Sequence, residues 1–181
     1  MRRTDITPTG IERTFRDDQI IVSKTDPQGR LTYVNRLFME ISAFEEADLI
    51  GQPHNVIRHP DMPRTIFGLL WERIRSGQEV FAYVVNLAHD GAHYWVLAHV
   101  TPTFDEAGRI VGHHSTRRSV MASKAARFAA LYRDLCAAEA QHANIHDAVA
   151  AGRALLDARL AETGTTYDEL VWSVINAEVA A

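Results

Sequence analysis

A change in composition near Ser119 divides the chain into two parts that need different architectures. Before this point, short runs rich in β-branched and aromatic residues alternate with turn sequences, and after it the sequence is rich in alanine and poor in glycine. The first pattern is typical of strands joined by turns and helices, whereas the second is typical of amphipathic helices. We therefore expect a mixed α+β domain followed by an α-helical C-terminal extension. The expected parts are an N-terminal cap segment (1–17), the α+β domain (18–118) and the helical extension (119–181).

Five strands are predicted in the first part, two before a helical stretch and three after it. Residues 35–76 carry apolar side chains at helical spacing, and Pro63 suits the first turn of a helix. Turns that contain glycine, of which Asp26-Pro27-Gln28-Gly29 is the first, separate the strands within each group. A five-stranded antiparallel sheet with helices on one face buries all of these elements and leaves room for a ligand between the two layers. The predicted strands are residues 20–25, 31–34, 80–88, 92–104 and 109–118.

The extension shows three apolar stripes, each at the spacing of one helix face. Gly164 is expected to end the second helix, and Thr166 with Glu169 forms a capping box for the third. Each stripe has to be buried against the open sheet face, another stripe or a second copy of the chain. Trp95 and Tyr94 alternate faces, so we expect one of them to pack under the N-terminal segment or the extension. The stripes are Phe128, Leu131 and Leu135; Ile145, Val149, Leu156 and Leu160; and Tyr167, Leu170, Val171 and Val174.

Charge and composition disfavour several classes of protein. The 181 residues are 46% hydrophobic and 23% charged, which is ordinary for a folded chain. A formal net charge of -4 at pH 7 disfavours a nucleic-acid partner, because no excess of cations is available to neutralise phosphates. No apolar run is long enough to span a bilayer, and polar residues follow Arg2 and Arg3 where a secretion signal needs apolar ones. With its single cysteine, Cys136, the sequence favours the cytoplasm.

The segment from Gly51 to Pro63 is the richest candidate for a binding site. Its three prolines fix the path of the chain and interrupt the helical pattern, while polar side chains crowd together. Arg58 and His59 offer hydrogen-bond donors, and Asp61 offers an acceptor, within a few residues. A ligand with phosphate groups or ring heteroatoms would use all three side chains.

Together with the strand motifs, this segment resembles the PAS domain of bacterial aerotaxis receptors. The similarity covers residues 17–118, and Arg58-His59-Pro60-Asp61-Met62-Pro63 is its most specific string. The resemblance implies the PAS fold and a non-covalently bound FAD whose redox state reports oxygen or respiratory status. It also implies a sensor rather than an enzyme. The other matching motifs are Tyr33-Val34-Asn35, Gly51-Gln52-Pro53-His54-Asn55, Trp71, Asp90-Gly91 and His93-Tyr94-Trp95-Val96.

A flavin site of eight residues follows from the resemblance. Arg58 suits phosphate or carbonyl oxygens, and Asn35 and Asn86 can each donate and accept hydrogen bonds at the polar edge of an isoalloxazine ring. Aromatic walls would exclude water, and burial around the ring would tune its redox potential. We expect that replacing Arg58 or Asp61 by alanine lowers FAD occupancy while the fold persists. The implied residues are Asn35, Arg58, His59, Asp61 and Asn86 in or beside the cleft, with Phe67, Trp71 and Tyr94 as its walls.

One strand departs from the pattern of the flavin-binding relatives. After Ser76-Gly77-Gln78-Glu79 they usually carry a tryptophan, where this chain has Val80 and Phe81. Phe81 could replace that tryptophan only if the strand register moved by one residue, which would turn its side chain to the other face. The relatives' basic stretch before the next turn is also absent, being Leu87-Ala88-His89 in this chain. FAD is the leading cofactor, and the stacking partner of its ring is left open.

Two other functions remain open. A PAS module without a cofactor would use the extension to form a homodimer or to dock on a chemoreceptor or a histidine kinase. A haem-based gas sensor would use His93 and His99, which share a strand face, whereas the adjacent His113 and His114 point to opposite faces. No phosphate-binding glycine loop, nucleophile elbow or kinase signature favours an enzyme.

Overall fold

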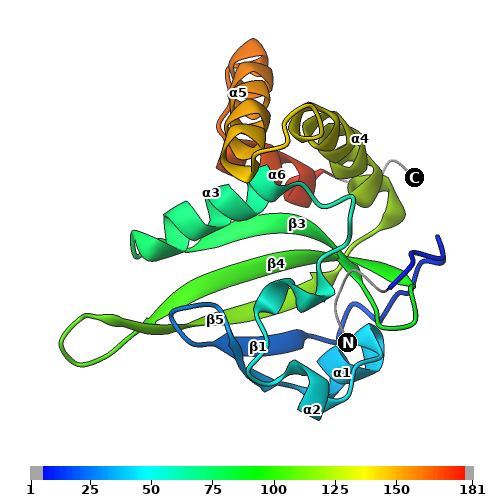
Figure 1. Cartoon of the computed structure of the whole chain (residues 1–181), viewed down its shortest axis with the longest axis vertical. Helices are drawn as coiled ribbons and strands as arrows, with labels where there is room; N and C mark the ends of the chain where they lie inside the picture. The colour runs from blue at the N-terminus through cyan, green and yellow to red at the C-terminus, as the bar shows by residue number, and fades with distance from the viewer. Residues whose placement is uncertain (1–5, 178–181) are drawn as a thin grey trace.

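The computed structural model describes residues 6–177, and its centre is a five-stranded antiparallel sheet (Figure 1). The strands are β1 (Ile21–Thr25), β2 (Leu31–Val34), β3 (Val80–Leu87), β4 (His93–Phe104) and β5 (Ile110–Ser119). Their order is β2-β1-β5-β4-β3, so the first and the last strand of the sequence are hydrogen-bonded neighbours. Each strand begins and ends within one residue of its predicted bounds. The five-stranded antiparallel sheet that the sequence predicts is thus confirmed.

The segment between β2 and β3 forms a helical layer on one face of the sheet (Figure 1). Asn35 begins its first helix, because the side-chain oxygen accepts a hydrogen bond from the backbone N–H of Phe38 at 3.1 Å. Pro63 stands immediately before the last of these helices as its N-cap, one residue earlier than predicted. The layer consists of α1 (Arg36–Ser42), α2 (Glu46–Leu49), the 3₁₀ helix η2 (His54–Ile57) and α3 (Arg64–Arg75).

The C-terminal extension consists of α4 (Ala122–Glu139), α5 (Ile145–Thr163) and α6 (Tyr167–Asn176). Two of these helices, α4 and α6, cover the other face of the sheet. Phe128 on α4 stacks on Tyr83 of β3 with ring centroids 4.3 Å apart, and Tyr132 lies over Trp95 of β4 at 6.0 Å. The position of Trp95 confirms that one aromatic residue of this strand packs under the extension.

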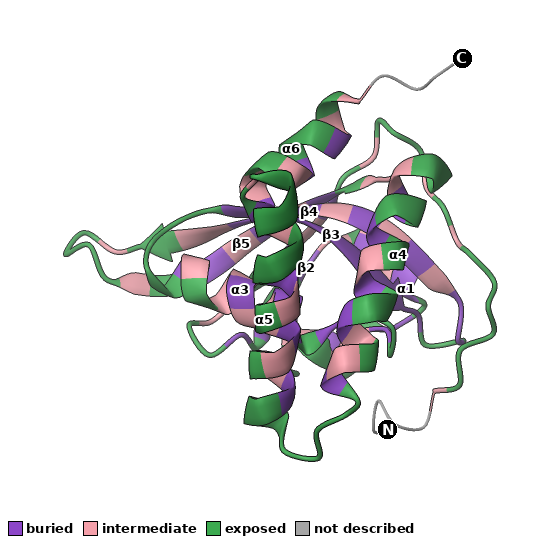
Figure 2. Cartoon of the chain, turned by 90° about the horizontal axis from the view of Figure 1, so that it is seen from above, coloured by how far each residue is buried: buried purple, intermediate pink, exposed green. Residues whose placement is uncertain are grey.

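Helix α5 packs beside α4 and crosses α3 on the outside of the first helical layer (Figures 1 and 2). Gly152 permits this close approach, since a Cβ atom at this position would lie 2.0 Å from the hydroxyl oxygen of Thr65. Helix α6 follows β3 and is joined to α3 by an ion pair between Arg73 and Asp168 at 2.9 Å. The extension therefore wraps around the β3 edge of the sheet and contacts both of its sides.

All three predicted stripes contribute to the chain's own core. Ile145 was assigned wrongly, because it is the first residue of α5 and its side chain is 62% exposed. The predicted ends of the helices are confirmed: Gly164 is the C-cap of α5 at φ 63°, and Thr166 with Glu169 forms the capping box of α6. Among residues 6–177, no helix combines the length and the apolar character needed to cross a bilayer. The stripe residues that are buried are Phe128, Leu135, Leu156, Tyr167, Val171 and Val174.

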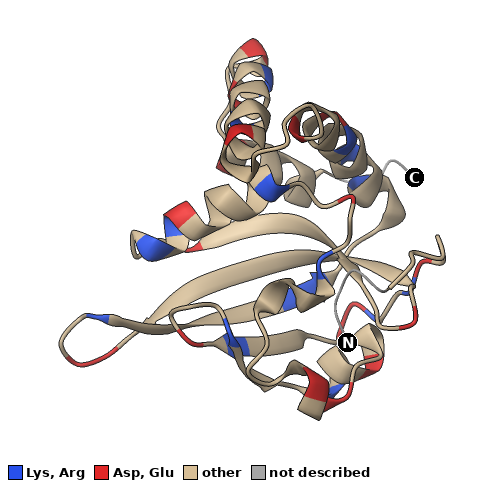
Figure 3. Cartoon of the chain, viewed as in Figure 1, with Lys and Arg blue, Asp and Glu red and all other residues tan. Residues whose placement is uncertain are grey.

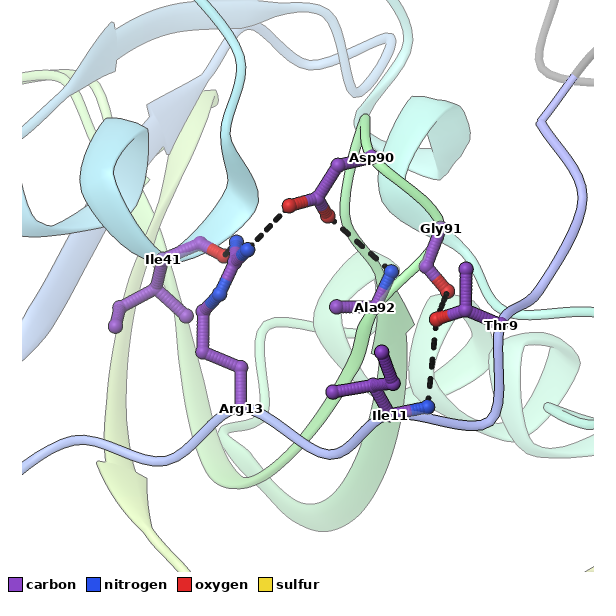
Figure 4. Close-up of polar contacts among 7 residues, drawn as sticks. All are labelled: Thr9, Ile11, Arg13, Ile41, Asp90, Gly91 and Ala92. Atoms are coloured by element: carbon purple, nitrogen blue, oxygen red, sulfur yellow. Dashed lines mark hydrogen bonds and ion pairs between the residues drawn. The ribbon is translucent and has the colours of Figure 1, made fainter.

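The N-terminal segment is held against the β3–β4 turn and α1 (Figure 4). The backbone N–H and the hydroxyl of Thr9 both donate to the carbonyl oxygen of Gly91, at 2.8 and 3.0 Å. Arg13 pairs with Asp90 and donates to a carbonyl oxygen of α1. Gly91 is required here, because its φ is +86° and an added Cβ would lie 2.4 Å from the carbonyl oxygen of Thr7. Residues 1–5 of the predicted cap segment lie outside the described residues.

Candidate functional site

A cavity of about 350 Å³ lies between α3 and the face of the sheet that the first helical layer covers. Its walls come from β1, β3, β4 and β5 on one side and from η2 and α3 on the other. Phe67 and Trp71 supply aromatic surface from α3, and Val84 supplies aliphatic surface from β3. The volume lies within the range of small-molecule sites in proteins.

Strand β5 gives the cavity a polar wall. Because side chains alternate along a strand, His113, Ser115 and Arg117 share the face that lines the cavity. Arg117 is only 3% exposed, and one of its terminal nitrogens donates to the hydroxyl of Ser23 at 2.9 Å. The same nitrogen contacts Nε2 of His54, which η2 presents from the opposite wall. Arg117 and His54 thus join the two layers at the cavity.

Three buried polar atoms in this wall have no hydrogen-bond partner among the described residues. They are Nδ2 of Asn86, Oγ of Ser115 and Nη1 of Arg117. Burying an unsatisfied polar atom costs about 1–3 kcal/mol, and a charged group costs more. An occupant that accepts hydrogen bonds from Asn86 and Arg117 would remove this cost, so the wall is suited to a ligand with carbonyl oxygens or ring nitrogens.

The cavity carries positive charge without compensating carboxylates. Arg58, Arg75 and Arg117 line it, whereas no aspartate or glutamate belongs to its described lining. None of the five strands contains an acidic residue, and Figure 3 shows the acidic residues on helices and loops. Burial lowers the pKa of Arg117 to about 10, which still leaves the guanidinium charged at neutral pH. The site therefore favours an anionic ligand or one that acquires negative charge.

His54 is neutral in this environment. Burial is the main cause, and the charge of Arg117 adds to it, so that the pKa of His54 falls from 6.5 to about 3. A neutral imidazole can accept a hydrogen bond from Arg117, whereas a protonated one would place two cations in contact. The Arg117–His54 contact is thus compatible with neutral pH and not with acid.

Stability is expected to fall as the pH is lowered from 7 to about 5. The unfolded chain takes up a proton on His54 near pH 6.5 while the folded protein does not, so the contribution is present above 6.5 and is lost as the pH falls toward 3. We expect a loss of about 1–2 kcal/mol over this interval, measured by urea denaturation. In the His54→Gln variant, the part of the stability loss that comes from protonation of His54 should be absent. An identical pH dependence in both proteins would show that His54 is not held neutral.

Trp71 lines the cavity where α3 meets the β1–β2 turn. Its ring lies edge-on to His113 with centroids 5.5 Å apart, and the guanidinium of Arg75 lies 5.0 Å from the ring centroid. Gly29 leaves room for this ring. Its φ is +82°, and a Cβ atom added at this position would lie 2.6 Å from the indole ring of Trp71. The turn and α3 therefore meet at Trp71, and access to the cavity depends on how these two elements are placed.

The structure brings four of the eight predicted site residues together on the cavity wall. They are Arg58, Phe67, Trp71 and Asn86. Arg58 lies over the ring of Phe67 at 5.7 Å, and its backbone pairs with that of Asn86 in an isolated antiparallel bridge. This bridge places the segment after η2 against the open edge of β3.

The other four predicted residues lie outside the cavity lining. Asn35 is engaged by the backbone: Oδ1 accepts from two backbone N–H groups, and Nδ2 donates to the carbonyl oxygen of Ile20 at 2.9 Å. Nδ1 of His59 accepts from the backbone N–H of Asp61 at 3.1 Å, and the carboxylate of Asp61 is 84% exposed. Tyr94 faces the same side as Asn86 but is buried within the core.

Strand β3, which departs from the pattern of the flavin-binding relatives, has not shifted its register by one residue. Val80 faces the helices and packs with Ile74, while Phe81 faces the extension. Phe81 stacks on His99 with centroids 4.1 Å apart and contacts Trp172 of α6. The ring of Phe81 is therefore on the wrong face to take the place of the missing tryptophan in the cavity.

No group of three or more potential metal ligands occurs among residues 6–177. His93 and His99 do share the face turned toward the extension, away from the cavity. His99 forms an ion pair with Glu79 at 2.7 Å when protonated, and His93 lies 5.8 Å from His59 by ring centroids. His113 lines the cavity and His114 does not, in agreement with their predicted opposite orientation. The two histidines that the sequence suggested as haem ligands, His93 and His99, therefore lie outside the cavity, whose lining contains His54 and His113 instead.

Sequence reasoning missed the most deeply buried charge of the site. Arg117, Ser115 and His54 were not predicted as site residues, although all three line the cavity. The alternation of strand residues contained a signal, since it places His113, Ser115 and Arg117 on one face of a strand that must be buried on that side. His54 lies within the Gly51-to-Pro63 segment that the sequence singled out, but only Arg58, His59 and Asp61 of that segment were chosen as site residues.

A protein-family model described as the PAS fold matches residues 19–115, which is more than half of the chain. The chain belongs to the PAS family. The matched range contains all five strands except the end of β5, together with the helices that form the cavity. The PAS fold expected from the sequence is therefore confirmed.

Three curated relatives of this PAS domain belong to bacterial regulatory proteins. The aerotaxis receptor of Escherichia coli K12 is 37% identical over 119 residues, 66% of this chain. The nitrogen fixation regulatory protein of Klebsiella pneumoniae is 25% identical over 58% of the chain, and the biofilm dispersion protein BdlA of Pseudomonas aeruginosa is 24% identical over 48%. The chain spans 23% of the length of the aerotaxis receptor and 21% of the length of each of the other two.

Solved structures of light-oxygen-voltage domains share the fold. One, studied with a flavin analogue, superposes with a TM-score of 0.57 at 16% identity and covers 61% of this chain and 84% of its own. The domain of the blue-light activated histidine kinase EL346 from Erythrobacter litoralis gives a TM-score of 0.51 at 19% identity, covering 54% of this chain and 93% of its own. At these identities the likeness concerns the fold alone.

Proposed function

We propose that this PAS domain is a sensor that binds FAD non-covalently in the cavity and reports redox or oxygen status through its helical extension. The role is one of binding and signal transduction rather than catalysis. The observation that carries the proposal is the cavity wall in which Asn86, Ser115 and Arg117 present unpaired polar atoms beside the aromatic rings of Phe67 and Trp71. An isoalloxazine ring has an apolar body for the aromatic surface and a polar edge for the unpaired atoms.

The relatives favour this ligand over others. The resemblance of the Arg58-to-Pro63 segment to aerotaxis receptors implies FAD, and a curated aerotaxis receptor is 37% identical. One structural neighbour is a light-oxygen-voltage domain studied with a flavin analogue. A flavin is thus the cofactor that fits both the wall of the cavity and the family.

The size of the cavity determines how FAD would lie. At about 350 Å³ it accommodates the ring system, while the phosphates and the adenosine need further space. Arg75 and Arg58 in the lining of the cavity supply cations that suit phosphate oxygens. We infer that the ring occupies the interior and that the phosphate-bearing end leaves past one of these arginines.

The extension is the proposed output of the sensor. It touches the sheet through Phe128 and Tyr132, and it touches the segment next to Arg58 through Cys136, whose thiol donates to the carbonyl oxygen of Asp61 at 3.4 Å. We propose that this contact transmits changes at the cavity to a cytoplasmic partner such as a chemoreceptor or a histidine kinase. Its apolar stripes are mostly buried within the chain, so they give little reason to propose a module that works only by dimerisation.

The test is an absorption spectrum of protein purified from flavin-replete cells, followed by identification of the flavin released on denaturation. We expect a yellow protein with a single FAD per chain. Arg58→Ala should weaken FAD binding by roughly tenfold or more, through the loss of a charge-assisted hydrogen bond. Arg36→Ala, which removes an exposed arginine of α1, is the matched control and should bind normally. A folded protein that stays colourless after incubation with excess FAD would refute the proposal.

A further inference from the structure

We propose that Arg117 makes the cavity selective for negative charge, so that a bound flavin ring is held in an anionic form once it is reduced. This inference rests on the proposed flavin binding and adds a property that the binding alone does not require. It assigns to Arg117 the role of a specificity-determining residue for the charge of the ligand.

The guanidinium of Arg117 is only partly used by hydrogen bonds within the chain. Ser23 and His54 contact one terminal nitrogen, while the other, Nη1, is buried and has no partner among the described residues. The ring of Phe38 lies beneath the cation, 5.5 Å from the guanidinium carbon to the ring centroid. Arg117 is thus fixed on two sides, and it lines the cavity as a buried cation.

The charges around Arg117 leave it uncompensated. The groups coupled to it are neutral His54 from η2 and Tyr94 from β4, and the cation of Arg58 lies in the same cavity lining. His113 on β5 and Arg75 on α3 are the remaining titratable groups of the lining, and none of them is acidic. A buried cation without a counter-ion carries a desolvation cost of several kcal/mol in proteins generally. A negative charge on the occupant offsets this cost, whereas a neutral occupant offsets only part of it.

The reduction step has a defined balance. A bound flavin would supply two-electron redox chemistry: reduction by an external two-electron donor such as dithionite, with uptake of one proton, would leave the ring with one negative charge. Arg117 would stabilise that charge, while His54 stays neutral at its side.

Arg117 should therefore raise the redox potential of the bound ring. The anionic reduced form gains more from the nearby cation than the neutral oxidised form does. We expect that Arg117→Met lowers the preference for the reduced ring by at least roughly tenfold, equal to about 30 mV for a two-electron couple. The Arg117→Lys variant keeps the charge without the planar donor set. Its redox potential should therefore lie between those of the wild type and Arg117→Met.

The experiment follows the absorption spectrum of the dithionite-reduced, flavin-bound protein from about pH 5 to about pH 8, where neutral and anionic reduced rings have distinct spectra. The wild type should keep the anionic spectrum throughout, and Arg117→Met should convert to the neutral form as the pH falls. Arg118→Met is the matched control, since Arg118 is an exposed neighbour on the opposite face of β5. It should behave as the wild type.

The outcomes separate this inference from the proposed function. If the wild type binds flavin but its reduced spectrum titrates to the neutral form as readily as that of Arg117→Met, the role of Arg117 is refuted and flavin binding stands. If the wild type binds no flavin, the proposed function itself fails. Should Arg117→Met not fold, Arg117→Lys and the wild-type titration still decide, because a neutral reduced ring in the wild type contradicts the inference by itself.

Discussion

Replacing Phe128 by alanine is expected to lower the free energy of unfolding by about 3–5 kcal/mol. Phe128 is 2% exposed and lies between Tyr83 of the sheet and Tyr132 of its own helix, with ring centroids 4.3 and 5.7 Å away. The truncation removes the ring contacts and leaves a cavity that rigid neighbours cannot fill. The change should be measured by urea denaturation monitored with far-ultraviolet circular dichroism.

The matched control for Phe128→Ala is Ile145→Ala. Ile145 also belongs to an apolar stripe of the sequence, but its side chain is 62% exposed, so the substitution should change the unfolding free energy by less than about 0.5 kcal/mol. Limited proteolysis adds a second readout, because a loosened α4 becomes accessible between Ser119 and α5. Equal stabilities of the two variants would mean that the extension is not docked on the sheet.

Replacing Glu139 by alanine is expected to lower the free energy of unfolding by about 2–4 kcal/mol, because it removes a buried hydrogen-bond acceptor. The buried carboxylate at the end of α4 accepts hydrogen bonds from the backbone N–H groups of Arg64 and Thr65, at 3.0 and 2.8 Å. It also accepts one from the hydroxyl of Thr65 at 2.8 Å. These N–H groups belong to the first turn of α3 and have no partner within the helix, so a carboxylate from elsewhere in the chain serves as their cap.

Two further variants separate the capping role from a general effect of charge. Glu139→Gln retains one acceptor oxygen and should recover part of the loss. Glu162→Ala, which removes an exposed carboxylate of α5, should have little effect. If Glu139→Ala unfolds at the same urea concentration as the wild type, α3 does not depend on the extension for its N-terminal cap. Flavin content is a useful additional measurement, because α3 also carries Phe67 and Trp71.

Local patterns predicted the elements of the fold well. Turns such as Asp26-Pro27-Gln28-Gly29 and the regular alternation of apolar residues fix where strands begin and end, since both are properties of neighbouring residues. The strand order is a different matter. Pairing of β1 with β5 joins Ile21 to Arg117, and no local pattern contains that information. The sequence analysis therefore predicted five antiparallel strands without their order.

The candidate site was predicted in part, for the same reason. Arg58 and Trp71 were found because they belong to specific motifs, and both line the cavity. Asn35 belongs to a motif as well, yet its side chain is used to cap α1 and to hold β1, a role that a motif cannot distinguish from ligand binding. Arg117 was overlooked because an arginine in a strand is most often solvated, and only the three-dimensional packing shows that it is buried.

The position of β5 next to β1 has a consequence for biosynthesis. β1 and β2 leave the ribosome before the other strands of the sheet, and the central partner of β1 is made only after the cavity-forming helices and two more strands. Until Ser119 has emerged, the nascent hairpin keeps an unpaired edge and exposed apolar residues such as Ile21 and Leu31, and such long-range pairing is slow to form. The growing chain is therefore most vulnerable to aggregation midway through translation, and truncation before β5 should yield insoluble fragments, whereas a stop after it leaves the sheet complete.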